Sequence, residues 1–215
     1  MSILVLHDDD FGAAVASRLC SASSDAAAVR LDDWPCPEEL DSLVATAHQV
    51  VFAWSRPVQR LESAVDSAAL RHGVTLLPVV AEGMATRVGP LLTPRTPATV
   101  DCYYRRRAQR AGAHSRLGAV HTHFDDHPTG EPAGYLAATI ATVCGLARHL
   151  LRASADEDTA DQARLVLVHP LTGEAAGSVL LGVHGNARSR APFPPEQRTF
   201  ARLRGIVRDA MEVNA

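Results

Sequence analysis

Apolar positions in the first half of the chain form short continuous runs that alternate with segments of helical spacing. Four runs predict buried strands: Ile3–Leu6, Ala28–Leu31, Gln49–Trp54 and Val74–Val80. Three segments with apolar residues three or four positions apart predict helices: Phe11–Cys20, Glu38–Ala47 and Val58–His72. Gly73, directly after the third segment, is typical of a helix C-cap. This alternation predicts an α/β fold with a doubly wound, mostly parallel, Rossmann-like sheet.

A proline-rich segment follows, and it predicts a strap that crosses the domain. The segment Thr86–Arg110 contains three prolines, Pro90, Pro94 and Pro97. Proline fixes φ and cannot donate to a sheet ladder, so we expect the strap to be neither a helix nor a central strand. Gly89 allows the backbone to pass close to another part of the chain. The segment ends in a predicted helix that begins near residue 101 and is rich in tyrosine and arginine.

The second half predicts further helices and an antiparallel pair of strands. The stretch Gly112–Gly130 is polar, so we expect an irregular loop there. The remaining predicted elements are an apolar helix over Tyr135–Leu151, a hairpin of Leu165–His169 with Ser178–His184, and an arginine-rich amphipathic helix over Glu196–Val213. We therefore expect one α/β domain over residues 1–193 and a C-terminal helix within residues 194–215.

Composition and charge exclude several classes of protein. Of the 215 residues, 47% are hydrophobic and 21% charged, which is typical of a globular protein with a full core. The net charge of -3 favours neither a nucleic acid nor a membrane as partner. All 21 basic residues are arginine, so a P-loop lysine and a lysine Schiff base are both excluded. Four cysteines without paired spacing predict reduced thiols in the cytoplasm.

The turn between the first predicted strand and helix is where a doubly wound fold would bind a nucleotide pyrophosphate. Of the G-x-G-x-x-G pattern only the last glycine, Gly12, is present, and His7 and Asp9 stand at the other two glycine positions. The three carboxylates of residues 8–10 would repel phosphates, whereas they suit a helix N-terminus. The turn therefore favours acidic capping of the helix, with a metal-bridged phosphate site on the same carboxylates as the alternative.

A second polar cluster lies in the predicted loop after the strap. His121, His123, Asp125, Asp126 and His127 fall within seven residues, and imidazole with carboxylate can bind zinc or another divalent transition metal. Their spacing matches no regular zinc pattern, so a solvated polar loop is favoured. A metal site on this cluster remains the alternative.

The order of these features resembles the ThiF-like family, the relatives of ubiquitin-activating enzymes. The resemblance rests on the strand-helix opening, the VGPLL-T-P strap, a cysteine, an arginine-bearing helix, a long apolar helix and a hairpin ending in GVHGNARS. More narrowly, the chain is similar to the ThiF-like cyclodehydratase partner proteins of thiazole/oxazole-modified peptide biosynthesis, over residues 1–193. That resemblance implies a Rossmann-like ThiF-like sheet. It also implies a protein that presents a precursor peptide to a YcaO-type enzyme, which performs the ATP-dependent cyclisation.

The chain departs from that subfamily at the positions that bind zinc. There, two C-x-x-C pairs on the strap and after the hairpin supply four thiolates to a structural zinc ion. In this chain only Cys102 is present, and the other three positions are occupied by Arg105, Asn186 and Ser189. One cysteine cannot hold a tetrahedral zinc site, so we expect no bound metal and, with the nucleotide turn altered, no cofactor. The resemblance also implies a peptide-recognition domain ahead of the first strand, which we expect to be lost.

These observations favour a non-catalytic partner protein in ribosomal-peptide modification, and we assign no catalytic residue. The expected partners are a YcaO-type or other peptide-tailoring enzyme and a precursor peptide, with no nucleic acid and no membrane; homo-oligomer formation stays open. Five residues of types common in interface hot spots form the expected docking surface: Tyr103, Tyr104, Arg105, Arg106 and Arg107. Two alternatives are a metal-dependent enzyme that uses His121, His123, Asp125 and His127, and an adenylating-type enzyme that binds nucleotide weakly.

Overall fold

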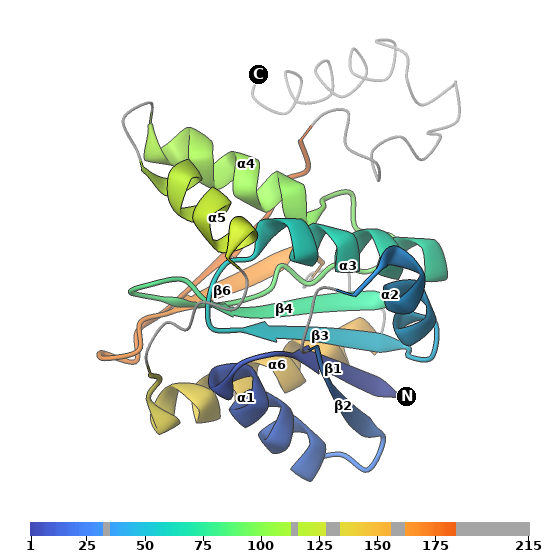
Figure 1. Cartoon of the computed structure of the whole chain (residues 1–215). Helices are drawn as coiled ribbons and strands as arrows, with labels where there is room; N and C mark the ends of the chain where they lie inside the picture. Colours follow the sequence, from blue (N-terminus) through green and yellow to red (C-terminus); the bar gives the residue numbers. More distant parts are fainter. Residues whose placement is uncertain (32–34, 113–115, 128–133, 156–161, 184–215) are drawn as a thin grey trace, which may run out of the picture.

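The structure, a computed structural model, describes residues 1–31, 35–112, 116–127, 134–155 and 162–183. Within these ranges seven strands form one sheet in the order β2-β1-β3-β4-β5-β6-β7 (Figure 1). The strands are β1 (Ile3–His7), β2 (Ala26–Arg30), β3 (Gln49–Trp54), β4 (Thr75–Ala81), β5 (Thr86–Val88), β6 (Arg164–Val168) and β7 (Ala175–Val179). The first four strands are mutually parallel, and β5, β6 and β7 continue the sheet with antiparallel pairing.

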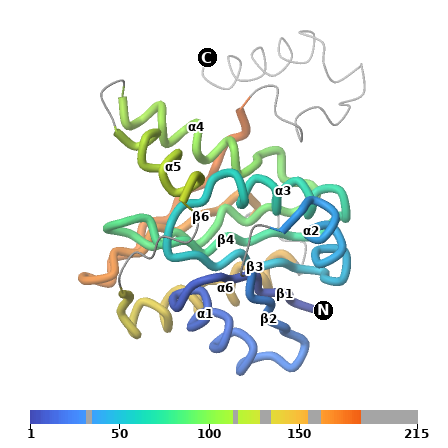
Figure 2. The backbone as a smooth tube through the Cα atoms, in the orientation of Figure 1, coloured from blue at the N-terminus to red at the C-terminus, as the bar shows by residue number. Residues whose placement is uncertain are grey.

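Helices cover both faces of the sheet, which confirms the predicted doubly wound α/β class. The helices are α1 (Asp10–Ser21), α2 (Pro37–Val44), α3 (Gln59–His72), α4 (Val100–Ala111), α5 (Leu117–Asp126) and α6 (Ala137–Ala155). Figure 1 shows α1 and α6 on one side of the sheet and α2 and α3 on the other. In the tube of Figure 2, α4 and α5 lie together beyond α3. The connection from β1 leads to β2 on one side while β3 lies on the other, so the order reverses between β1 and β3.

Two buried apolar layers, one on each face, hold the helices on the sheet. Phe52 and Leu76 belong to the layer beneath α2 and α3, whereas Val51 and Leu77 belong to the layer beneath α1 and α6. All six residues of β3 are buried, as expected for a central parallel strand covered on both faces. The strand and helix predictions for this half of the chain are confirmed, with boundary shifts of at most three residues.

Three elements differ from the sequence predictions. Thr86–Val88 is a strand inside the sheet rather than extended strap, because the three prolines begin only at position 90 and leave its hydrogen bonds intact. Part of Gly112–Gly130 is the helix α5, because Leu117, Val120, His121 and Phe124 have helical spacing once His121 counts as an inward-facing residue. The second hairpin strand is Ala175–Val179 rather than Ser178–His184, since pairing with β6 fixes its register.

The strap proper, residues 89–99, is fixed by close packing over the amino end of β6. Gly89 has φ 98°, and a Cβ there would lie 2.5 Å from the carbonyl oxygen of Arg164. This close approach confirms the role predicted for that glycine. The Leu91 amide donates to the Arg164 carbonyl at 2.9 Å, and the Leu91 carbonyl accepts from the Ala163 amide at 2.9 Å. Leu92 forms a bridge with Leu76 of β4.

The predicted helix Glu196–Val213 and residues Asn186 and Ser189 lie outside the described residues. No helix within the described ranges has the length and apolar character needed to cross a membrane.

Candidate functional site

The turn between β1 and α1 is closed by the chain's own carboxylates. Asp9 is the N-cap of α1, and its side chain accepts from the amide of Gly12 at 2.7 Å, which confirms the predicted acidic cap. The second oxygen of Asp9 accepts from the amide of Ser55 at 2.7 Å, just after β3. Two backbone donors at the point where the strand order reverses are therefore already bound to one carboxylate.

A buried arginine lies close to two of the carboxylates of this turn. Arg56 is 1% exposed; its Nη2 lies 3.4 Å from Asp8 and its Nη1 lies 4.0 Å from Asp9. Burial raises the pKa of Asp8 above its usual value, and the charge of Arg56 opposes this rise. A Cβ at Gly12 would lie 2.4 Å from the carbonyl oxygen of Ala53, so this glycine allows α1 to pack directly on β3.

A second group of polar side chains, which we call the buried charge cluster, lies beneath α4 and consists of Glu62, Glu82, Arg87, Tyr103 and Tyr104. Arg87 of β5 is fully buried. Its Nη2 donates to both oxygens of Glu62 at 2.9 Å, and its Nε donates to Glu82 at 2.8 Å. Each ionised group in the cluster therefore has an opposite charge as a hydrogen-bond partner, which buried charges require.

The two tyrosines of α4 complete the cluster and are interior residues. Tyr103 donates to Glu82 at 2.6 Å and Tyr104 donates to Glu62 at 2.7 Å, and the Arg87 guanidinium lies 4.3 Å from the centre of the Tyr103 ring. Their exposed fractions are 7% and 3%. Both tyrosines therefore face the interior, because the two buried carboxylates need donors. Their expected role in docking stays a prediction.

Burial controls the titration of the cluster and of the histidine beside it. It raises the pKa of Glu62, opposed by the charge of Arg87, and it raises the pKa of Tyr104 well above its ordinary value. His121 of α5 packs against the Tyr104 ring at 5.0 Å between centroids. Burial, with the nearby positive charges of Arg107 and Arg87, lowers the pKa of His121 to about 4. The imidazole is therefore neutral at physiological pH.

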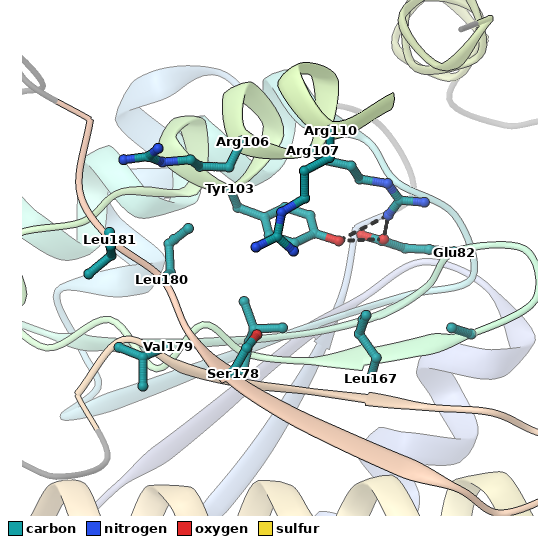
Figure 3. Close-up of a pocket in the computed structure, with 12 residues that line it drawn as sticks. Glu82, Tyr103, Arg106, Arg107, Arg110, Leu167, Ser178, Val179, Leu180 and Leu181 are labelled. Carbon is teal, nitrogen blue, oxygen red and sulfur yellow. Dashed lines mark hydrogen bonds and ion pairs between the residues drawn. The ribbon is translucent and has the colours of Figure 1, made fainter. Parts of the chain in front are cut away.

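A cleft opens between α4 and the end of the sheet, and Figure 3 shows the residues around it. Its volume is about 380 Å³. Its floor is apolar and comes from β6, β7 and the two residues after β7: Leu165, Leu167, Val179, Leu180 and Leu181. Its roof carries three arginines of α4, Arg106, Arg107 and Arg110. We call this the α4 cleft.

The three arginines of the roof differ in their partners. Arg107 is half-buried, forms an ion pair with Glu82 and donates to the Tyr103 hydroxyl at 2.9 Å, as the dashed lines in Figure 3 mark. Arg106 and Arg110 are exposed, and no carboxylate of the described ranges lies within ion-pair distance of either. Arg105 is also exposed but does not line the cleft. Of the five predicted docking residues, Tyr103, Arg106 and Arg107 line the cleft, and of these Arg106 has a guanidinium group without an acidic partner among the described residues.

Cys102 marks the point where α4 meets the segment after β7. Its Sγ accepts from the amide of Val183 at 3.2 Å and lies 3.2 Å from the Thr99 hydroxyl. Arg105, at the second position of the first cysteine pair, is exposed. The thiol of Cys102 therefore joins the two segments by a hydrogen bond.

The histidine and aspartate residues of the alternative metal site do not converge. His121 faces inward against Tyr104, whereas His123 and His127 stack on each other at 4.5 Å between ring centroids. Asp125 accepts from the Arg60 amide at 2.9 Å. Across the described parts of the chain, no three histidine, cysteine, aspartate or glutamate side chains come together in a group that could hold a metal ion.

Sequence reasoning missed the charged members of the cluster, Glu62, Glu82 and Arg87. One signal was available: Glu62 stands beside Leu61 on the apolar face of a predicted helix, where a solvated charge is not expected. Arg87 and Glu82 carried no such signal, because they flank a turn that could equally be solvated.

No protein-family model matches the sequence, and no curated protein sequence matches it. Solved structures share its fold at low identity. The heterocyclase TruD is 16% identical with a TM-score of 0.55, over 84% of this chain and 26% of that chain. E. coli MccB with MccA is 11% identical with a TM-score of 0.55, over 86% and 58%. The E. coli microcin synthetase McbBCD complex is 11% identical with a TM-score of 0.56, over 87% and 68%.

These likenesses define the class of fold, the α/β fold found in heterocyclase and microcin-synthetase proteins. The chain spans about a quarter of the length of the heterocyclase chains that it resembles.

Proposed function

We propose that this protein is a non-catalytic partner in ribosomal-peptide modification, which binds a precursor peptide or a YcaO-type tailoring enzyme. The proposal combines a fold shared with heterocyclase and microcin-synthetase proteins with a turn that is unsuited to nucleotides. In this proposal the YcaO-type enzyme supplies the chemistry.

The observation that carries the proposal is the double hydrogen bond of Asp9. In a nucleotide-binding α/β protein, backbone N–H groups at this turn bind phosphate oxygens. Here the amides of Gly12 and Ser55 donate to the Asp9 carboxylate at 2.7 Å each. A phosphate would have to displace a carboxylate that also faces the buried guanidinium of Arg56. The protein thus fills its own phosphate position, which favours loss of adenylation over weak retention of it.

A reconstitution experiment tests this proposal. The protein is mixed with a YcaO-type enzyme and a precursor peptide encoded beside its gene, and the loss of water from the peptide is followed by mass spectrometry. We expect cyclisation to accelerate when the protein is added, with ATP consumed only when the YcaO-type enzyme is active. No acceleration, or the absence of any peptide-tailoring gene nearby, contradicts the proposal.

The same mixture separates the adenylating alternative from the proposal. With a catalytically inactive YcaO-type enzyme, an adenylating protein would still exchange pyrophosphate into ATP, and a non-catalytic partner would not. Isothermal titration of the protein alone with ATP and Mg²⁺ provides an independent check, and we expect no heat of binding at millimolar nucleotide.

A further inference from the structure

We propose that the α4 cleft binds an extended peptide segment in which two acidic residues are separated by one apolar residue. This inference rests on the proposed function for the source of the peptide, namely the precursor. The binding chemistry itself is read from the cleft.

Charge is the first argument. The protein is acidic as a whole, with a net charge of -3, yet the roof of the cleft presents Arg106 and Arg110 without a carboxylate partner in the described ranges. The third guanidinium, Arg107, is already neutralised by Glu82. Arginine binds carboxylates through paired, charge-assisted hydrogen bonds, so the two remaining guanidinium groups select acidic ligands.

Spacing is the second argument. Arg106 and Arg110 are four positions apart on α4, so they share one face and their Cα atoms are separated by about 6 Å along the helix axis. In an extended peptide, side chains two positions apart point to the same side and are separated by about 6.6 Å. Two carboxylates in an acidic-apolar-acidic pattern therefore match the spacing of the two arginines along α4, and the residue between them points to the opposite side.

The floor is the third argument, because it receives that opposite side of the peptide. Leu165 and Leu167 of β6 provide apolar surface, and the paired residues of β7 on the same face are Ser178 and Ala176. Because these side chains are small, they leave space above the sheet for a ligand. At the mouth, Val179 and Leu181 are 55% and 68% exposed, so apolar surface remains open to a partner.

The charge of the cleft also discriminates between occupants. Residues 184–215 contain six arginines against three acidic residues, so the roof would repel the chain's own C-terminal segment. A single-stranded nucleic acid is anionic, but its bases stack on aromatic side chains, and the floor is aliphatic. An acidic, alternating peptide fits both surfaces of the cleft.

Fluorescence anisotropy with a defined probe tests the inference. The probe is a short fluorescein-labelled peptide in which glutamate alternates with valine, and its comparators are a lysine-valine peptide and a peptide of the same composition with its glutamates grouped together. We expect the alternating acidic probe to bind at least ~10-fold more tightly than either comparator. A hydrogen-bonded ion pair lost from such a contact typically changes affinity by about tenfold or more.

Three variants of one helix provide the matched comparison. Arg106→Ala and Arg110→Ala should each weaken the alternating acidic probe by about tenfold, whereas Arg105→Ala, equally exposed but outside the cleft, should not change its affinity. The double variant Arg106→Glu/Arg110→Glu should instead prefer the lysine-valine probe. Circular dichroism of each variant verifies that α4 is intact.

Several results overturn the inference. They are equal binding of the alternating and grouped probes, an equal loss from Arg105→Ala, displacement of the probe by an oligothymidine, and concentration-dependent self-association that blocks the probe. The failure is distinguishable from failure of the proposed function: acceleration of peptide cyclisation without binding of the acidic probe removes only the peptide assignment. Probe binding without acceleration removes only the proposed role in peptide modification.

Discussion

At the residue scale, Arg87 is the residue on which the buried charge cluster depends. It is fully buried and binds Glu62, Glu82 and the carbonyl oxygen of Gly89, so it links α3, the β4–β5 turn and the strap. A buried ion pair of this kind contributes little net stability compared with apolar residues of equal volume. Removal of one partner is different, because it leaves an uncompensated charge in the interior.

We therefore expect Arg87→Met to lower the free energy of unfolding by about 3–5 kcal/mol, the range for breaking a buried pair. The two carboxylates left behind keep their tyrosine donors but lose their shared cation. Urea denaturation followed by circular dichroism measures the loss. Arg105→Met, at an exposed position of α4, is the control and should change the stability little. Equal stability of the two variants would show that the cluster does not depend on Arg87.

His121 gives the domain a defined pH response. Its pKa is about 4 in the folded protein, below the value of 6.5 that it has when solvated, so the unfolded chain binds the extra proton between these values. The stability contributed by neutral His121 is complete above pH 6.5 and is lost as the pH falls towards 4. One group can change the free energy of unfolding by at most about 1.4 kcal/mol per pH unit.

We expect His121→Phe, which keeps an aromatic ring against Tyr104, to be relatively more stable at low pH. The difference in unfolding free energy between this variant and the natural protein should grow as the pH falls from 6.5 to 4.5, measured by urea denaturation at each pH. His123→Phe, at an exposed position of the same helix, serves as control for the substitution of a histidine by phenylalanine. A constant difference for His121→Phe across this window would place the imidazole in solvent.

At the element scale, the start of α1 shows how a nucleotide-binding turn becomes a structural cap. Asp9 accepts from amides on α1 and after β3, so one side chain both begins the helix and joins two neighbouring connections. We expect Asp9→Ala to lower the free energy of unfolding by about 1–2 kcal/mol, the range for loss of an N-cap. Asp10→Ala, in the exposed first turn, is the matched control and should change the stability much less.

Thermal unfolding in the presence and absence of ATP adds a second readout to the Asp9→Ala variant. We expect no stabilisation by ATP, because the carboxylate of Asp8 and the acidic first turn remain after the substitution. A rise in melting temperature with ATP in the variant alone would show that Asp9 is all that excludes phosphate from the turn.

The sequence predicted elements where one periodicity dominates, and it missed elements that tertiary contacts create. The run Gln49–Trp54 and the helix ended by Gly73 followed directly from apolar spacing and cap chemistry. The strand Thr86–Val88 has only three residues, and Thr86 pairs with Ala81, 5 positions before it, and with Val168, 82 positions after it. The helix α5 was missed because His121 was counted as polar although it is buried.

The candidate site was harder to predict than the fold for a related reason. A pattern of apolar and polar positions places Glu82 and Arg87 on the surface, and only the three-dimensional arrangement shows that they form ion pairs and hydrogen bonds with each other and with Glu62. The sequence pattern also did not show that Tyr103 and Tyr104 are buried, since their hydrogen-bond partners, Glu82 and Glu62, are distant in sequence. The exposed Arg105 and Arg106 were among the predicted residues, because solvent exposure is what a polar pattern normally predicts, whereas Arg110 was not.

At the scale of the whole molecule, the turn after β1 and the α4 cleft differ in whether they are open to a ligand. The turn after β1, where related folds bind nucleotide, is closed by Asp9 and Arg56. The α4 cleft beside β7 is open, apolar below and basic above. Strands β3, β4 and β5 lie between the turn after β1 and the α4 cleft. Binding of a ligand in the α4 cleft therefore needs no nucleotide at that turn.

The strap between β5 and α4 is expected to keep its place without a metal ion. Leu91 exchanges two backbone hydrogen bonds with residues at the start of β6, and the Cys102 thiol accepts from the Val183 amide at 3.2 Å. A structural zinc ion contributes folding energy directly, so its removal would lower the melting temperature steeply. We expect the purified protein to contain much less than one equivalent of zinc, and its melting temperature to be unchanged by a chelator.

We further expect Cys102→Ala to remain folded, with a free energy of unfolding that is lower by about 1 kcal/mol because one hydrogen bond is lost. One tightly held equivalent of zinc, together with unfolding by the chelator or by Cys102→Ala, would show that the metal and not the backbone pairing secures the strap.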